Sequence, residues 1–406
     1  MSDMTERERR QRVIDHLRAG KTQDAADELA ARAEAYPGDG DLHHAIGLAF
    51  ASGGTLGAAR QQLEEAAKLS PRSAPIRADL AQVWLAQGRP DEALESAEQA
   101  LALDPQSSLS RFTLGRAYLA KACAQQSRSP TRPEPGFDFP LMDGRAPLYL
   151  RALTEMEAAL YSGPPFAGAV RAALAFAYVR AGHLHAAAEQ LAAELADLPP
   201  GDEADRVAER LRSVELEIAR ERYWTEVGQT GVEIRGAGRS PELLLRLAHS
   251  YAVAGDEQSL TDTLAQARAA GYGPRPAMVT RFEGEDSIVQ QLSDVHLFIA
   301  GGLECVLNGE LRFLPFNDLS SIVLGPAAHW RAAQVELITR EMLEVDVPAL
   351  YRLSLRSPND LIQSGRFTQF KYSPGETRYA RALGSRSLTT EDSVVAFTDV
   401  KAIRFL

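Results

Sequence analysis

Apolar and polar residues follow two different patterns along the chain, and the change falls roughly two thirds of the way along it. Up to about residue 270, apolar residues recur every three to four positions, the spacing of one helix face. From about Phe282 onward, apolar and polar residues alternate singly, which indicates half-buried strands. The pattern predicts an α+β protein with a helical part, residues 1–276, and a largely antiparallel β-rich part, residues 280–406.

Prolines divide the first helices at a constant interval. Pro37, Pro71 and Pro105 are 34 residues apart (71 − 37 = 105 − 71 = 34), and each closes an alanine-rich amphipathic run. Gly54 and Gly88 fall where the two helices of a pair must turn, since glycine tolerates a left-handed backbone. A 34-residue period of helix pairs is that of the tetratricopeptide repeat, and the sequence resembles this family. We therefore expect an all-α solenoid.

The fourth repeat is interrupted by an insert, predicted at about 122–147. Its proline, Pro164, lies about 25 residues later than the period requires, and the insert is rich in proline and turn residues. It is either a mobile loop or, through Phe137, Phe139 and Met142, a docking element. A fifth repeat ends at Pro199, residues 202–226 read as one or two helices, and a sixth helix pair follows within 243–274.

The repeat pattern also predicts which side chains line the concave face of the solenoid. These come from the first helix of each pair, and most of them are apolar, which suits an amphipathic helix of a partner protein. The alternative is that they pack against the insert, against neighbouring repeats or against a second copy. The ring of basic and amide residues that would grip a terminal carboxylate is missing. The candidate groove residues are His44, Leu48, Gln82, Leu85, Phe112, Arg116, Leu119, Phe176 and Val179.

Two hairpins are predicted in the C-terminal part. Asn308 and Gly309 stand between apolar runs, which is a strong hairpin signal, and a second hairpin is expected around Thr339 and Arg340. Another strand and turn, or strand pair, closes the chain at 393–406.

The order of short motifs in this part resembles the ImpE family, also called TagJ, an accessory component of bacterial type VI secretion. The motifs are an Asn-Gly turn, a Pro-Phe pair, a Pro-x-Leu-Tyr segment, a Gly-Arg-x-Thr stretch and a terminal Ile-x-Phe. In this chain they are Asn308-Gly309, Pro315-Phe316, Pro348 with Leu350 and Tyr351, Gly365-Arg366 with Thr368, and Ile403 with Phe405.

The resemblance implies a non-enzymatic adaptor that binds the amphipathic N-terminal helix of the small contractile-sheath subunit, through either part of the chain. In the β-rich part, Arg366 could hold a partner carboxylate, although a salt bridge within the domain is the simpler explanation. Two other hypotheses stay open: a general repeat scaffold unrelated to secretion, and an enzyme with a polar pocket in the β-rich part.

The composition of the chain disfavours several classes of partner, location and functional site. The net charge of −11 disfavours nucleic acid as a partner, because phosphate binding needs a basic face. The charged N-terminus and the lack of a long apolar run predict a cytoplasmic protein without membrane insertion. The two cysteines, Cys123 and Cys305, are far apart, and the histidines lack partners at zinc-ligand spacing. No phosphate loop or nucleophile elbow is present, so we expect no catalytic residue, cofactor or metal site.

Overall fold

The computed structural model divides the chain into two compact units. Unit 1 comprises residues 1–125 and 144–177, and unit 2 comprises residues 126–143 and 178–406. The residues that the structure describes are 16, 21, 23–25, 27, 28, 38–128, 143–230, 241–254, 256–271, 273–283, 286–294, 301–326, 328–351, 354–357, 366, 368–372, 380–383, 385–389 and 394–406. Most of the first predicted repeat and the core of the insert, with Phe137, Phe139 and Met142, lie outside them.

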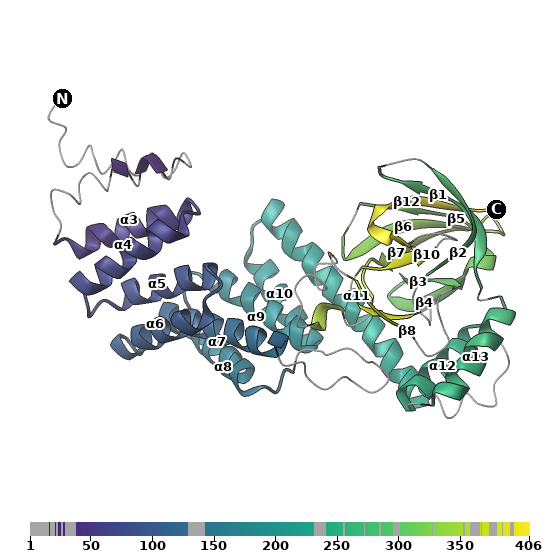
Figure 1. Ribbon diagram of the computed structural model, residues 1–406, viewed down its shortest axis with the longest axis horizontal. Helices are drawn as coiled ribbons and strands as arrows, with labels where there is room; N and C mark the ends of the chain where they lie inside the picture. The colour runs from purple at the N-terminus through teal and green to yellow at the C-terminus, as the bar shows by residue number, and fades with distance from the viewer. Residues whose placement is uncertain are drawn as a thin grey trace. The chain divides into compact units, whose positions relative to one another are not determined.

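Unit 1 consists of consecutive antiparallel helix pairs (Figure 1). The predicted solenoid is confirmed, because each pair of helices spans one predicted repeat. The helices are α3 (Gly40–Ser52), α4 (Leu56–Leu69), α5 (Ala74–Ala86), α6 (Pro90–Leu103), α8 (Pro147–Tyr161) and the greater parts of α7 (Ser108–Arg128) and α9 (Ala167–Ala181).

Small residues let these helices approach closely. A side chain at Gly47 would place its Cβ 2.6 Å from Leu63 Cγ on the partner helix, and one at Gly115 would meet Met156 at the same distance. Gly54 and Gly88 have φ angles of +76° and +71°, so both turns use the conformation that glycine favours. The buried side chains between successive pairs are mostly alanine, leucine and valine, together with Trp84.

Helix α7 continues to Arg128, so its last turns fall within the range predicted for the insert. Ala122 and Gln126 are buried there, and Gln126 Nε2 donates a hydrogen bond to the carbonyl of Asp143 (3.1 Å). Packing of these two side chains explains why the helix extends past the position where turn residues begin to dominate the sequence.

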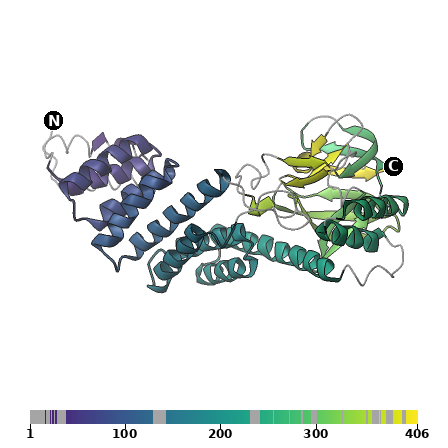
Figure 2. The same cartoon turned by 60° about the horizontal axis from the view of Figure 1, so that its bottom comes forward.

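The helices that lie wholly within unit 2 are α10 (Leu184–Asp197), α11 (Asp202–Thr230), α12 (Pro241–Ala254) and α13 (Glu257–Ala269). The region read as one or two helices is a single 29-residue helix, α11. Helices α12 and α13 form the predicted sixth pair, and both views show them side by side (Figures 1 and 2). None of the described helices is both long and apolar enough to cross a membrane.

A curled antiparallel sheet completes unit 2. The described residues form a ten-stranded sheet in the order β11-β10-β2-β1-β12-β5-β6-β7-β3-β4, beside a two-stranded sheet, β8-β9. The strands are β1 (Arg275–Arg281), β2 (Ser287–Asp294), β3 (Gly302–Leu307), β4 (Glu310–Pro315), β5 (Leu319–Leu324), β6 (Trp330–Leu337), β7 (Met342–Pro348), β8 (Gln369–Tyr372), β9 (Ala380–Leu383), β10 (Ser387–Thr389), β11 (Val394–Ala396) and β12 (Val400–Phe405).

Both predicted hairpins are present. β3 pairs with β4, and Asn308 and Gly309 between them both have positive φ angles, 53° and 79°. This is the turn geometry for which Asn-Gly is preferred. β6 pairs with β7 across a turn in which Arg340 has φ 73°. The final predicted strands also form, but β11 pairs with β10 while β12 pairs with β1 and β5.

The sheet has apolar packing on both faces around β3. Leu303 and Cys305 belong to the core inside the curled sheet, whereas Val306 packs in a second core formed with helices α11, α12 and α13. The helix pair predicted as a sixth repeat therefore shares a core with the sheet. Because β1 already begins at Arg275, the strands start before residue 280; the domain division at 276–280 remains a prediction.

Candidate functional site

On the first helices of unit 1, two of the predicted groove residues form one polar cluster. His44 Nε2 lies 2.7 Å from Asp79 Oδ2, and Gln82 Nε2 donates to Asp79 Oδ1 (3.0 Å). Asp79, which the repeat pattern did not single out, thereby joins α3 to α5. The cluster gives this stretch of the first helices a fixed arrangement of polar groups.

The predicted residues on α7 lie deeper. Phe112 and Leu119 are each only 8% exposed, and the ring centroid of Phe112 is 5.8 Å from that of Phe166. Arg116 stands over the Phe112 ring at 5.7 Å, and partial burial lowers the pKa of its guanidinium. These side chains thus contribute to the packing of unit 1 as well as to the predicted lining.

The remaining predicted groove residues differ in exposure and in place. Leu48 and Phe176 are 43% and 49% exposed, and Leu85 is partly buried against the core around Trp84. Val179 belongs to unit 2, where it lines a cavity. The assignment of all nine residues to a partner-binding groove remains a prediction.

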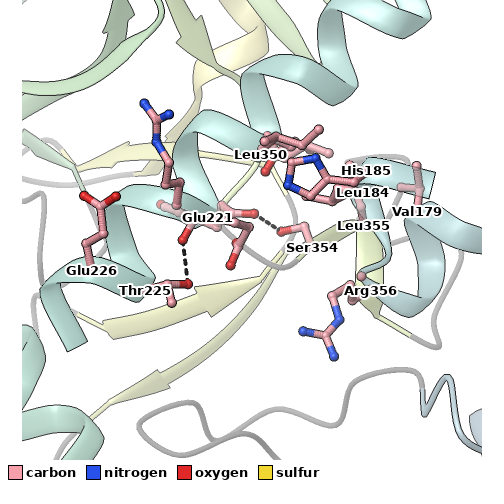
Figure 3. Close-up of a pocket in the computed structure, with 15 residues that line it drawn as sticks. Val179, Leu184, His185, Glu221, Thr225, Glu226, Leu350, Ser354, Leu355 and Arg356 are labelled. Atoms are coloured by element: carbon pink, nitrogen blue, oxygen red, sulfur yellow. Dashed lines mark hydrogen bonds between the residues drawn. The ribbon is translucent and has the colours of Figure 1, made fainter. Parts of the chain in front are cut away.

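Unit 2 contains a cavity of about 460 Å³. Three segments line it: the end of α9 with the start of α10, one face of α11, and the segment that follows β7. Figure 3 shows Glu221 and Glu226 on the α11 side and Arg356 on the opposite side. The lining residues are Val179, Gly182, Leu184, His185, Glu217, Ile218, Glu221, Arg222, Thr225, Glu226, Leu350, Tyr351, Ser354, Leu355 and Arg356.

A buried ion pair holds α11 to the sheet behind this cavity. Arg220 donates from Nε and Nη2 to the two carboxylate oxygens of Glu304 on β3, at 2.8 and 2.7 Å. Its Nη1 donates to the carbonyl of Leu350 (3.2 Å) and lies 3.4 Å from Glu217 Oε1. Both side chains of the pair are about 2% exposed. A forked guanidinium–carboxylate pair of this kind fixes orientation as well as distance.

A second buried pair fixes the segment after β7. Arg386 donates from Nε and Nη2 to Asp294 Oδ2 (3.0 and 2.8 Å), and from Nη1 to the carbonyl of Pro348 (3.3 Å). The hydroxyl of Tyr351 donates to Asp294 Oδ1 (3.1 Å) and accepts from the backbone N–H of Ser387 (3.0 Å). The Pro-x-Leu-Tyr motif therefore forms one wall of the cavity, held at Pro348, Leu350 and Tyr351 by buried polar groups.

Glu217 is a partly buried carboxylate in the cavity lining. Trp330 Nε1 donates to Glu217 Oε1 (3.1 Å). Burial raises the pKa of Glu217 to about 7; Arg220 opposes the shift, whereas Glu221 and Glu304 add to it. Burial likewise raises the pKa of the Tyr351 hydroxyl, with the neighbouring Asp294 carboxylate adding to the rise. A carboxyl group that titrates near neutral pH thus faces the cavity.

The sequence reasoning missed this cavity, although one signal was visible. Glu304 stands inside an otherwise apolar strand, and a carboxylate at such a position requires a buried counter-charge. That partner is Arg220, which lies 84 residues away in the sequence, so no local pattern could identify it.

The candidate residue Arg366 is exposed. Thr368, two residues further on, donates from Oγ1 to the carbonyl of Ser385 (3.1 Å). This hydrogen bond fixes the position of Thr368. Gly365 lies outside the described residues. A role for Arg366 in partner binding remains a prediction.

Potential metal ligands do not gather within the described part of the chain: no group of three or more His, Cys, Asp or Glu side chains there is placed to hold an ion. Burial raises the pKa of the Cys305 thiol to about 12, so the thiolate that acts as a nucleophile is disfavoured.

Known protein families match segments of both the helical part and the β-rich part of the chain. Residues 286–404 match the family described as ImpE protein, and residues 49–108 and 85–124 match the tetratricopeptide repeat. Both families are non-catalytic adaptor domains. The chain is therefore a helical-repeat protein, and the two matched families support a protein-interaction adaptor. The match to the ImpE family over residues 286–404 agrees with the resemblance that the order of motifs predicted.

Solved structures similar to this chain share little sequence with it. Protein VPA1032 from Vibrio parahaemolyticus is 14% identical, with 63% of this chain and 93% of that chain covered and a TM-score of 0.46. MamA from Desulfovibrio magneticus RS-1 is 20% identical, with coverages of 49% and 93% and a TM-score of 0.35. PilW, a type IV pilus biogenesis factor, is 15% identical, with coverages of 64% and 91% and a TM-score of 0.36. No curated protein matches the chain.

Proposed function

We propose that this protein is an adaptor of a bacterial type VI secretion system, similar to TagJ, and that it binds the amphipathic N-terminal helix of the small contractile-sheath subunit. The observation that carries the proposal is the ImpE match over residues 286–404 in a chain whose N-terminal part consists of tetratricopeptide repeats. An adaptor for this partner would act in the cytoplasm.

The first helices of unit 1 supply chemistry suited to such a helix. Leu48 on α3 and Phe176 on α9 are large apolar side chains with 43% and 49% of their surface exposed. Because about half of each side chain is already buried, covering either one would contribute about 1 kcal/mol before ordering costs are subtracted. The cluster of His44, Asp79 and Gln82 provides polar partners for the hydrophilic edge of the bound helix.

The direct test is fluorescence anisotropy of a labelled peptide with the sequence of the host's small sheath subunit N-terminal helix, titrated with the full chain. The variant should carry Leu48→Glu and Phe176→Glu. Phe112 and Leu119 are unsuitable positions, because both are buried and their substitution would disturb packing. Tyr161→Glu is the matched control, since Tyr161 is 96% exposed but lies at the end of α8, the second helix of its pair.

We expect micromolar binding to the unmodified chain and to Tyr161→Glu, and at least a tenfold loss in the double variant. Binding that persists in the double variant would move the contact away from the solenoid groove and toward unit 2. If neither the unmodified chain nor either variant bound the peptide, the general repeat scaffold would replace the secretion adaptor as the better account.

A further inference from the structure

The cavity of unit 2 has one acidic wall and a largely apolar remainder. Helix α11 places Glu217 and Glu221 one turn apart on the face that lines it. The apolar surface comes from all three lining segments, with Leu184, Ile218, Leu350 and Leu355. Figure 3 shows Arg356 on the side away from Glu221 and Glu226.

The buried charges beside this wall do not balance among the residues that the structure describes. Arg220 is shared by two carboxylates, and both oxygens of Glu304 receive its forked hydrogen bonds. Glu217 is left with the longer contact of 3.4 Å to Arg220 and with the indole N–H of Trp330. The second buried pair, Arg386 with Asp294, is matched one to one. When Glu217 is ionised, this cluster therefore carries one negative charge in excess.

An excess buried carboxylate is costly, and a cation placed next to it offsets that cost. The cavity offers room for such a cation, and its apolar surface would suit a hydrocarbon stem. Long basic side chains combine both features, an aliphatic stem and a charged end.

We propose that this cavity binds the basic side chain, lysine or arginine, of a partner protein. Its stem lies on Leu184, Ile218 and Leu350, and its charged end reaches Glu217. The proposal concerns unit 2 alone and does not depend on which helix occupies the groove of unit 1.

The titration behaviour of Glu217 supports this assignment and predicts how binding depends on pH. Burial, together with Glu221 and Glu304, raises its pKa to about 7, against the opposing effects of Arg220 and the Trp330 hydrogen bond. Five further titratable or charged groups line the cavity: His185, Arg222, Glu226, Tyr351 and Arg356. A cation favours the ionised carboxylate, so its affinity should rise about tenfold between pH 6 and pH 8, following the ionised fraction of a group with this pKa.

The test uses small probes on the full chain. Butylguanidinium and butylammonium represent the arginine and lysine side chains, and butylurea is the uncharged counterpart of similar shape. The signal is the indole N–H resonance of Trp330 in nitrogen-15-labelled protein, which is assigned by its loss in Trp330→Phe. Because this N–H donates to Glu217, its chemical shift reports on the carboxylate directly. Titrations are run at constant ionic strength at pH 6 and pH 8.

We expect a saturable shift with at least one of the two cations, about tenfold tighter at pH 8 than at pH 6, and no saturable shift with butylurea. Glu217→Gln keeps an acceptor for Trp330 and should abolish the response. Glu215→Gln, an exposed position on the same helix, should leave it unchanged. The proposal fails if neither cation gives a saturable shift, if butylurea gives the same shift, or if Glu217→Gln binds as tightly as the unmodified chain. Neither the sheath peptide nor the groove variants enter this test, so it is independent of the secretion proposal.

Discussion

Units 1 and 2 are held together by different kinds of contact. In unit 1 the core consists of small and aliphatic side chains between helices that follow each other in the chain. In unit 2, Arg220, Arg331 and Arg386 are among the largest fully buried side chains. Their hydrogen bonds join residues up to 130 positions apart. Nearest-neighbour packing of repeats therefore stabilises one unit, and a long-range polar network orders the other.

This difference bears on function. A repeat surface can vary along its length while each pair keeps its own local core. The cavity of unit 2, in contrast, depends on several buried groups at once. Glu304 and the carbonyl of Leu350 hold Arg220 on α11, and Asp294 holds Tyr351 in the cavity wall. We therefore expect substitutions of these buried groups in unit 2 to lower the unfolding free energy more, and to affect more of the unit, than substitutions in unit 1.

The largest effect should follow from breaking the ion pair between α11 and β3. Arg220→Met leaves Glu304 buried without its counter-charge, which costs about 3–5 kcal/mol of unfolding free energy. Denaturant unfolding of the full chain, followed by tryptophan fluorescence, measures this loss. Combining it with Glu304→Leu should recover most of the stability. A single variant as stable as the unmodified chain would show that the network does not order unit 2.

In unit 1 the corresponding test is Leu63→Ala. Leu63 is fully buried against Gly47, and its truncation should cost about 2–5 kcal/mol by leaving a cavity. Hydrogen exchange should show faster opening in α3, α4 and α5, whereas α12 and α13 should keep their protection. Equal loosening of both units would contradict the picture of local repeat packing.

Glu217 should make stability depend on pH in the direction opposite to that of a salt-bridged carboxylate. Its pKa is raised from about 4.5 in the unfolded chain to about 7, so the folded state binds the proton more tightly. Stability from this group is present at low pH and is lost as pH rises from about 4.5 to 7, by at most about 3 kcal/mol. Chemical denaturation at several pH values should show the decline in the unmodified chain and a flatter profile in Glu217→Gln. Parallel profiles would exclude the perturbed titration.

The smallest effect should be the same in both units. Asp39 caps α3 by accepting from the N–H of Leu42 (3.0 Å), and Asp256 caps α13 by accepting from that of Ser259 (3.1 Å). Alanine at either position should cost about 1 kcal/mol, because a cap is a local interaction that does not depend on the surrounding architecture. A cost several times larger at Asp256 would indicate that α13 is coupled to the polar network, unlike α3. Thermal unfolding of the two variants makes the comparison.

How much the sequence could predict follows from the same contrast. The period of 34 residues predicted the helix pairs, and the Asn308-Gly309 turn predicted its hairpin, since both depend on neighbouring residues. Contacts between distant segments could not be predicted from any local pattern. Examples are the pairing of β1 with β12 and the ion pair of Arg220 with Glu304. The Pro-x-Leu-Tyr motif was visible only as a family resemblance. Its physical role, the wall of a cavity, depends on Arg386 and Asp294, which lie far from it in sequence.

In our proposal, the first helix of each repeat binds a partner's amphipathic helix. Hydrogen–deuterium exchange of the full chain with and without the sheath-subunit peptide tests it most directly, because both units are read in one experiment. We predict new protection in α3, α5, α7 and α9. Protection confined to α11 and the segment 350–356, or no change in any helix, would contradict the claim.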